Sequence, residues 1–349
     1  MIQQILDKAR WAPSGDNTQP WRFEIIDPLH LAVHAYDTRE HCVYDLDGHP
    51  SQVSHGALLE TMAIAASAHG LRADIARRAG TPDDHPVYDV RFVADPAITR
   101  SPLVDVIETR SVHRRKLETR PLTAQEKQAL EAAVGSDYDL TWFESFGARL
   151  QAARLMFDNA KVRLTMPEAY RTHYDIIEWD ASESEDRVPD QALGVNSGTL
   201  RMMKWAMVSW DRLSTMNTLM GTWGPRLEMD LVPGLACGAH FVIKAKRAPA
   251  GIDDYVAAGR AVQRFWLELT RLGLRMQPEM TPLIFARYLR NATPFTKADK
   301  VEAAARRLLP QLRELIGEDV PNAVFIGRIG AGNPYDARSK RKALSKLMK

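Results

Sequence analysis

Residues 56–72, GALLETMAIAASAHGLR, carry small or apolar side chains around nearly the whole circumference of a helix that their spacing predicts over 52–69. A helix without a polar face is buried on most sides, and its small residues permit another backbone to approach closely. A second stretch of equal length, GRAVQRFWLELTRLGLR at 259–275, predicts another largely apolar helix over 255–272. Both stretches begin with glycine and close on Gly-Leu-Arg, with that last glycine placed as a left-handed C-terminal cap would be. The chain therefore uses one pattern twice.

Short strand patterns surround both predicted helices. They occur at 21–27, 30–36 and 87–94 in the first half and at 138–145, 239–246 and 323–329 in the second. We interpret the chain as an internal duplication of two fused α+β units. The boundaries we expect are 1–100 and 101–335, followed by a basic tail at 336–349. Because no Gly- and Ser-rich linker divides the halves, we expect them to pack intimately.

Composition is that of an ordinary soluble protein. The chain has 349 residues, of which 45% are hydrophobic and 26% charged, and its net charge of +2 gives no indication of a nucleic-acid partner. Cys42 and Cys237 belong to no CxxC pair, which is typical of a reduced, cytoplasmic protein. The first residues show no signal-peptide pattern. The apolar stretch 199–223 is interrupted by four charged residues, so we expect no membrane span.

A run of six polar or small residues stands where a plain connector needs one or two. In ARWAPSGDNTQPWRFEI, residues 9–25, the helix pattern of 2–12 stops at Pro13, and Trp21, which we expect to be a packing residue, opens a strand. The excess between them predicts a ligand or an unusual turn. The corresponding segment 130–143, LEAAVGSDYDLTWF, lacks the counterparts of Pro13, Asn17 and Gln19. A ligand site built on this loop should therefore occur once.

A second candidate is basic. The segment TRSVHRRKL, 109–117, precedes a capping-box pattern that begins at Thr123. It is either a solvated basic patch or a phosphate clamp, because guanidinium groups present paired donors to phosphate oxygens. A further arginine, Arg328, lies inside the apolar strand pattern NAVFIGRIG, where it faces either outward or a buried anion.

Other patterns are less informative. No HExxH motif and no Cys/His cluster indicates a metal site, and no GxGxxG, P-loop or GxSxG motif is present. Residues 202–229 hold six of the thirteen methionines, as expected of ordinary core or of a flexible flap over a flat ligand. Residues 338–349 contain six basic side chains and no acid, which we interpret as a solvated end.

These motifs carry a family resemblance. APSGDNTQPWRF resembles the signature loop of the FMN-dependent nitroreductase family, TRSVHRR resembles the arginine motif that grips the FMN phosphate, and YVAAGRAVQRFWLELTRLGL looks like the core helix of that family. Ordinary members carry the arginine motif ahead of the loop and work as homodimers. Its position in mid-chain is similar to the single-chain, Acg-like branch, in which two nitroreductase-like halves imitate a dimer. The resemblance spans roughly residues 1–335.

The resemblance implies one FMN per chain, bound between the halves, without a need to dimerise. The first half would border the flavin and the second would hold its phosphate; the implied residues are Pro13, Ser14, Gly15, Asn17 and Gln19, then Arg110, Ser111, Arg114 and Arg328. The hydride chemistry belongs to the flavin, so no catalytic side chain is expected.

The implied function is an FMN-dependent NAD(P)H oxidoreductase that reduces a small nitroaromatic, quinone or similar conjugated acceptor. The alternative is a protein that sequesters FMN beneath a flap at 199–229, and a third hypothesis is a binding domain without flavin. The sequence does not choose between NADH and NADPH.

Overall fold

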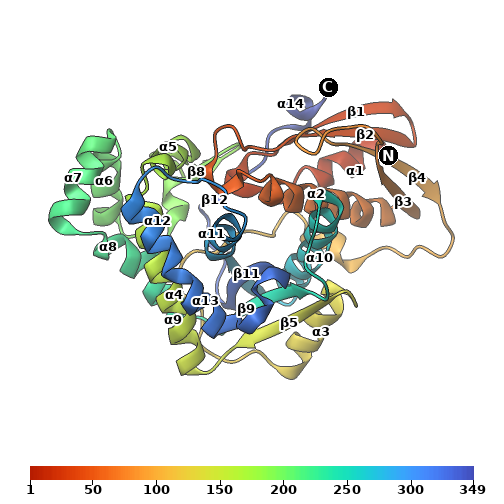
Figure 1. Ribbon diagram of the computed structural model, residues 1–349. Helices are drawn as coiled ribbons and strands as arrows, with labels where there is room; N and C mark the ends of the chain where they lie inside the picture. Colours follow the sequence, from red (N-terminus) through yellow and green to blue (C-terminus); the bar gives the residue numbers. More distant parts are fainter.

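A computed structural model describes residues 1–349. Two four-stranded antiparallel sheets form its framework (Figure 1). The first, in the order β1-β2-β4-β3, comprises β1 (Trp21–Asp27), β2 (His30–Ala35), β3 (Leu71–Arg77) and β4 (Val87–Ala94). The second, in the order β5-β9-β11-β10, comprises β5 (Tyr138–Phe143), β9 (Ala239–Ala245), β10 (Leu274–Pro278) and β11 (Ala323–Ala331). In each sheet, the strand that comes third in the sequence lies at an edge and pairs with the strand that comes fourth.

Helices α2 (His49–Ser67) and α10 (Ile252–Arg271) pack against each other between the two sheets. Their crossing is reciprocal. A Cβ at Gly56 would lie 2.0 Å from the carbonyl oxygen of Val256, and a Cβ at Gly259 would lie 2.0 Å from that of Val53. The glycines are therefore required for the close approach.

Both helices end as predicted. Gly70 and Gly273 have φ angles of +66° and +76°, in the left-handed region that favours glycine, and each leads directly into a strand. Those two strands, β3 and β10, were not predicted. The six predicted strands are confirmed with small differences at their ends, and the helix predicted over 2–12 is α1 (Ile2–Ala9). The capping box at the start of α3 (Ala124–Val134) is confirmed, since Thr123 and Glu126 bond each other's backbone N–H.

The connections between equivalent strands differ greatly. Only Pro28 and Leu29 separate β1 from β2, whereas residues 144–238 separate β5 from β9. This insertion contains α4 (Phe146–Thr165), α5 (Pro167–Ile176), β6 (Ile177–Glu178), β7 (Glu183–Ser184), β8 (Val188–Pro189), α6 (Ser197–Ala206), α7 (Trp210–Met220), α8 (Trp223–Arg226), a π-helical turn (Leu227–Leu231) and α9 (Val232–Leu235). Between β10 and β11 lie α11 (Thr281–Arg290), α12 (Asp299–Arg306) and α13 (Leu308–Ile316).

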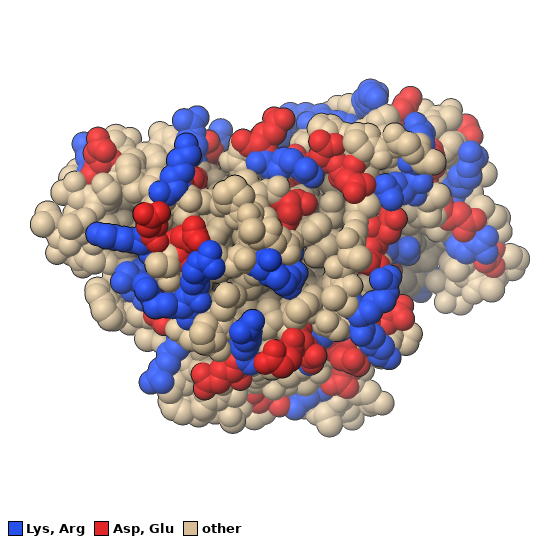
Figure 2. Space-filling model, in the orientation of Figure 1, with Lys and Arg blue, Asp and Glu red and all other residues tan.

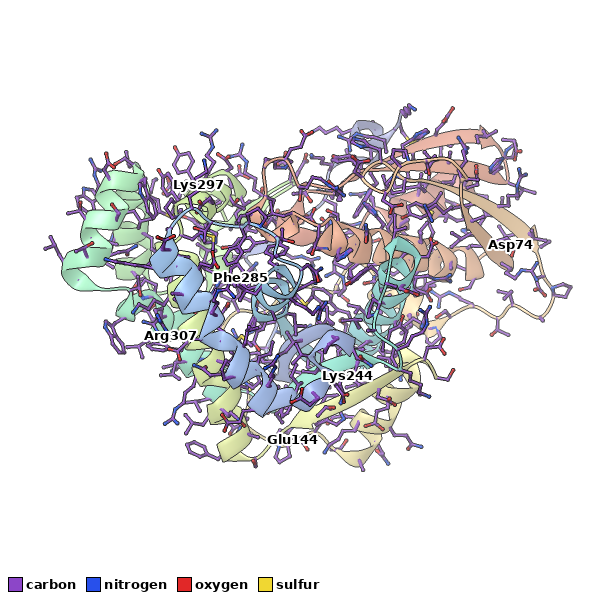
Figure 3. All side chains as sticks on the ribbon, viewed as in Figure 1. Asp74, Glu144, Lys244, Phe285, Lys297 and Arg307 are labelled. Carbon is purple, nitrogen blue, oxygen red and sulfur yellow. The ribbon has the colours of Figure 1, made fainter.

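Each sheet has its own buried core, a third core lies among α4, α11, α12 and α13, and a small fourth core lies within the insertion. Trp21, expected to be a packing residue, is fully buried in the first. Phe285 on α11 belongs to the third core and lies near the middle of the molecule in Figure 3. None of the helices is both long and apolar enough to cross a membrane.

The C-terminal segment is folded, so the interpretation of 338–349 as a solvated end is wrong. Strand β12 (Arg338–Ser339) pairs with β7, and α14 (Leu344–Leu347) places the side chain of Leu347 in the first core with no exposed surface. The backbone N–H of Lys349 donates to the carbonyl of Phe23, so the chain ends beside β1 (Figure 1). The basic composition of this segment was misleading, because the segment also carries apolar residues whose side chains are buried.

Candidate functional site

The loop at 13–19 has an unusual backbone. Asp16, Asn17 and Gln19 have φ angles of 51°, 63° and 52°, which few non-glycine residues adopt. The loop is held by the Ser14 hydroxyl, which accepts the Gln19 backbone N–H at 3.0 Å. A Cβ at Gly15 would meet no atom within 4 Å, so the loop leaves open space at this glycine. The prediction of an unusual turn is confirmed.

Two amide side chains tie the loop to distant segments. The Asn17 amide donates to backbone carbonyls of residues 187 and 340, at 3.2 Å each. The Gln19 amide donates to the carbonyl of Glu185 at 2.8 Å, and its oxygen accepts the Lys342 backbone N–H at 2.9 Å. Both residues are buried, but the Asn17 Oδ1 has no partner. Gln19 is therefore occupied by protein, while Asn17 keeps one free acceptor.

Arg110 is a buried cation without a carboxylate. It is 3% exposed, donates to the Trp11 carbonyl at 2.9 Å, and stacks on the Trp266 ring at 4.6 Å. It forms no salt bridge, and its Nε has no partner. Burial lowers the pKa of Arg110, and the neighbouring Arg338 and Arg341 lower it further. Arg110, Arg338 and Arg341 therefore form a group with an excess of positive charge.

Arg328 and Arg114 meet at a second place. Arg328 is 2% exposed and donates from Nη2 to the Arg114 carbonyl at 3.0 Å and from Nη1 to Glu279 at 2.8 Å. The other oxygen of Glu279 bonds His240 Nδ1 at 2.8 Å. Although burial opposes it, Glu279 raises the pKa of His240 to about 10, so the histidine is a cation. Arg328 therefore does not face outward: it faces a buried anion, the Glu279 carboxylate.

Arg114 itself has no salt bridge. Its guanidinium donates to the Ala192 carbonyl at 3.3 Å, and burial lowers its pKa to about 10, an effect that the Asp16 carboxylate opposes. Burial raises the pKa of Asp16, and Arg114 in turn opposes that rise. A residue of the predicted loop thus faces a residue of the arginine motif.

Further polar side chains lie beside this pair. We call Asp16, Tyr44, Arg114, Arg163 and His173 the polar cluster. The Tyr44 hydroxyl lies 2.9 Å from His173 Nε2. Burial lowers the pKa of His173 to about 3, with Arg163 contributing, and raises that of Tyr44. All five nevertheless keep part of their surface accessible. These side chains are therefore half-buried rather than part of the solid core.

An apolar cavity adjoins the polar cluster. Its volume is about 140 Å³, and Arg163 and His173 belong to its lining as well. We call it the methionine cavity, because six of its lining residues are Met166, Met202, Met203, Met207, Met216 and Met220. The predicted flap supplies five of these methionines, four of them on helices α6 and α7, so the flap covers a cavity. The outer face of the same segment exposes Trp205, Leu219 and Trp223, and this end of the molecule is largely tan in Figure 2.

The structure divides the predicted phosphate clamp. It brings Arg114 and Arg328 together near the loop, and it places Arg110 with two arginines of the C-terminal segment. Ser111 donates to the carbonyl of Val112 at 3.3 Å and lies between these groups in the chain. Pro13 and Ser14 are partly accessible at the start of the loop.

Sequence reasoning missed several polar residues here: Asp16, Tyr44, Arg163, His173, Glu279, Arg338 and Arg341. Three of them carried a signal. Asp16 stands inside the polar loop, and Arg338 and Arg341 belong to the run of charge in the tail. Of the others, Arg163 and His173 come from the insertion, Glu279 follows β10, and Tyr44 lies in the connection between β2 and α2, where no local motif marks them.

Comparison with known proteins supports part of this description. The Nitroreductase family model matches residues 1–50, which include the loop. A solved structure, a nitroreductase-like family protein from Bacillus cereus, aligns over 72% of this chain and 96% of its own, with 12% identity and a TM-score of 0.36. No protein of curated function matches the sequence.

Proposed function

We propose that the chain is an FMN-dependent oxidoreductase related to the nitroreductases, with the cofactor held where the loop at 13–19 meets the arginine motif. One observation carries the proposal: neither Arg110, which is buried, nor Arg114, which is half-buried, forms a salt bridge. An uncompensated buried charge is strongly destabilising, so an anionic ligand would offset a real cost. The match of the family model to the segment that contains the loop supports the choice of a flavin.

The residues present fit such a group. Arg114, with Arg328 behind it and Ser111 nearby, would hold the phosphate, while Arg110 and its arginine neighbours add positive potential. The open space at Gly15 and the free acceptor on Asn17 would border the ring. Bound FMN would supply the hydride chemistry, with NADH or NADPH as donor and a small conjugated molecule as acceptor. The protein's own part is to bind, orient and shield that group.

The two sheets support a duplicated origin. They share one strand order, and their central helices cross with reciprocal glycines. We infer that residues 1–100 and 101–335 are two units that imitate a dimer, so one chain would carry one complete site in the cytoplasm. The second unit has only Gly135–Asp137 between α3 and β5, too short to repeat the loop.

A sequestering protein is the second candidate, and the flap favours it. The flap is tied to α4 and α5 by several contacts: the Asn217 amide donates to the Leu164 carbonyl at 2.9 Å, the Tyr170 hydroxyl to the Met207 carbonyl at 2.8 Å, and Arg226 Nε to the Phe157 carbonyl at 2.8 Å. A flap held this firmly would exclude a nicotinamide from the flavin.

The first test is flavin content. The purified protein should be yellow and release one FMN per chain on denaturation. Arg114→Ala should weaken FMN retention by about one to two orders of magnitude, because a hydrogen bond to a charged group contributes about 1.5–3 kcal/mol. The control is Arg171→Ala, an exposed arginine on α5. Equal retention by both variants after dialysis would remove Arg114 from the site.

The second test separates enzyme from store. Under anaerobic conditions the flavin absorbance should disappear within seconds of mixing with NADH or NADPH, and return on addition of a quinone or nitroaromatic. Flavin that dithionite reduces, but that neither nicotinamide reduces, would favour sequestration.

A further inference from the structure

We propose that the methionine cavity binds a single-ring aromatic compound that carries one hydrogen-bond-accepting oxygen, as in an aryl ketone. The inference goes beyond the proposed function, because it uses the walls of this cavity and no property of a flavin.

Size limits the ligand to one ring. The cavity measures about 140 Å³. An engineered cavity of about 150 Å³ in another protein binds benzene, and pockets for drug-sized ligands measure roughly 300–1,000 Å³. Three fused rings therefore do not fit, and the flavin of the proposed function would lie outside this cavity.

The wall favours an aromatic ring over an aliphatic one. Besides its six methionines, the cavity is lined by Tyr170 and Trp210, whose rings lie 5.8 Å apart. Thioether sulfur makes favourable contacts with aromatic rings, and unbranched methionine side chains adapt to a flat shape. Aromatic pairs add a preference for offset or edge-to-face contacts with a further ring.

One end of the cavity supplies hydrogen bonding. Arg163 lines it, and only its Nη2 has a protein partner, Asp230 at 3.1 Å. A guanidinium donor that has no acceptor beside an apolar cavity is unfavourable, so an acceptor oxygen on the ligand would be stabilised. His173 also lines this end and is bonded through Nε2 to Tyr44.

The charge balance selects a neutral oxygen. Asp230 already compensates Arg163, and His173 is held neutral because burial lowers its pKa to about 3. A carboxylate would bring a negative charge that no free cation of the cavity balances, and burying such a charge is costly. A carbonyl or ether oxygen satisfies the Arg163 donor without this cost.

The test compares three molecules of similar shape by calorimetric titration of the full chain. Acetophenone has both the ring and the oxygen, cumene replaces the carbonyl with CH–CH₃, and cyclohexyl methyl ketone keeps the oxygen but loses the aromatic ring. We expect acetophenone to bind about tenfold or more tightly than either of the others. A two-ring ketone, 2-acetonaphthone, should not bind. Equal affinity for acetophenone and cumene, or no binding of any probe, would overturn the proposal.

A variant locates the donor. Arg163→Lys keeps a cation for Asp230 but removes the other guanidinium N–H groups, so acetophenone should bind no better than cumene while cumene binding stays unchanged. Retained cumene binding also shows that the cavity is still formed. The control is Arg154→Lys, an exposed arginine on the same helix. A preference for acetophenone that persists in Arg163→Lys would show that Arg163 is not the recognising group.

Discussion

The two sheets are built alike and connected differently. Both have the same strand order and both pack on a central helix, yet a two-residue turn in the first corresponds to residues 144–238 in the second. The polar loop occurs before β1 and is reduced to three residues before β5. Core residues of the two units must satisfy the same packing, whereas connections at the surface can lengthen freely. The candidate site and the methionine cavity both lie among the connections, which is where the surroundings of the two sheets differ most.

The strongest expected effect tests whether the helix crossing is equivalent in both units. Gly56→Leu and Gly259→Leu should each prevent folding, because a Cβ at either position already lies 2.0 Å from a carbonyl oxygen of the other helix. Soluble yield and circular dichroism measure this. The control is Gly147→Leu on α4, where a Cβ meets nothing within 4 Å. If one of the pair folds normally, the crossing is not reciprocal.

The next prediction compares two carboxylates: Glu279, buried just after β10, and Asp74, exposed on β3. Glu279→Gln, just after β10, should lose about 3–5 kcal/mol of unfolding free energy, because it leaves Arg328 and His240 as buried cations. Asp74→Asn on β3 should change nothing measurable, since Asp74 and its partner Arg72 lie in solvent at the outer edge of the first sheet (Figure 3). Urea titration measures both. Equal losses would mean that the two edges are energetically alike.

The third prediction assigns opposite pH limits to the two units. Burial lowers the pKa of His55 on α2 to about 4, so its contribution is present above about pH 6.5 and is lost as the pH falls towards 4. The pKa of His240 is raised to about 10, so its contribution is present below about pH 6.5 and is lost as the pH rises through 10. Melting temperature measured from pH 4 to 10 should fall at both ends. His55→Asn should flatten the acid limb and His240→Asn the alkaline limb; an exchange of these effects would contradict the assignment.

The smallest effect concerns the helices that open the two units. Thr123 caps α3 with its side chain, whereas α1 has no side-chain cap. Thr123→Ala should cost about 1 kcal/mol of unfolding free energy. Thr165→Ala, at the exposed end of α4, serves as the control. A loss no larger than that of the control would show that the capping box adds little here.

Local patterns were sufficient to predict most of the sheet framework. The central helices follow from their glycines and small residues, and six strands follow from alternation. β3 escaped because it is rich in charge: Arg72, Asp74 and Arg77 alternate with few large apolar residues. β10 escaped because it is only five residues long and ends in Pro278. Such strands form because a glycine turn directs the chain towards a neighbouring strand with which it can pair. A local sequence pattern contains no information about that neighbour.

The candidate site was predictable only where one segment carried it. The loop at 13–19 could be predicted from its run of polar and small residues, but the hydrogen-bond partners of Asn17 and Gln19 lie more than 160 residues away. The pairing of Arg328 with Glu279 also depends on the register of β11 beside β10. Long-range register decides which polar groups meet, and the sequence alone does not reveal it.

The last residues of the chain have a consequence for synthesis on the ribosome. β1 is an edge strand of the first sheet, and Met348 and Lys349 bond its backbone at Phe23. An uncovered edge strand is open to pairing with other chains. The first sheet, although translated first, therefore stays unprotected until residues 348 and 349 leave the exit tunnel. A nascent chain that stalls before these residues, or a product that lacks them, should aggregate through β1 even with every other element in place.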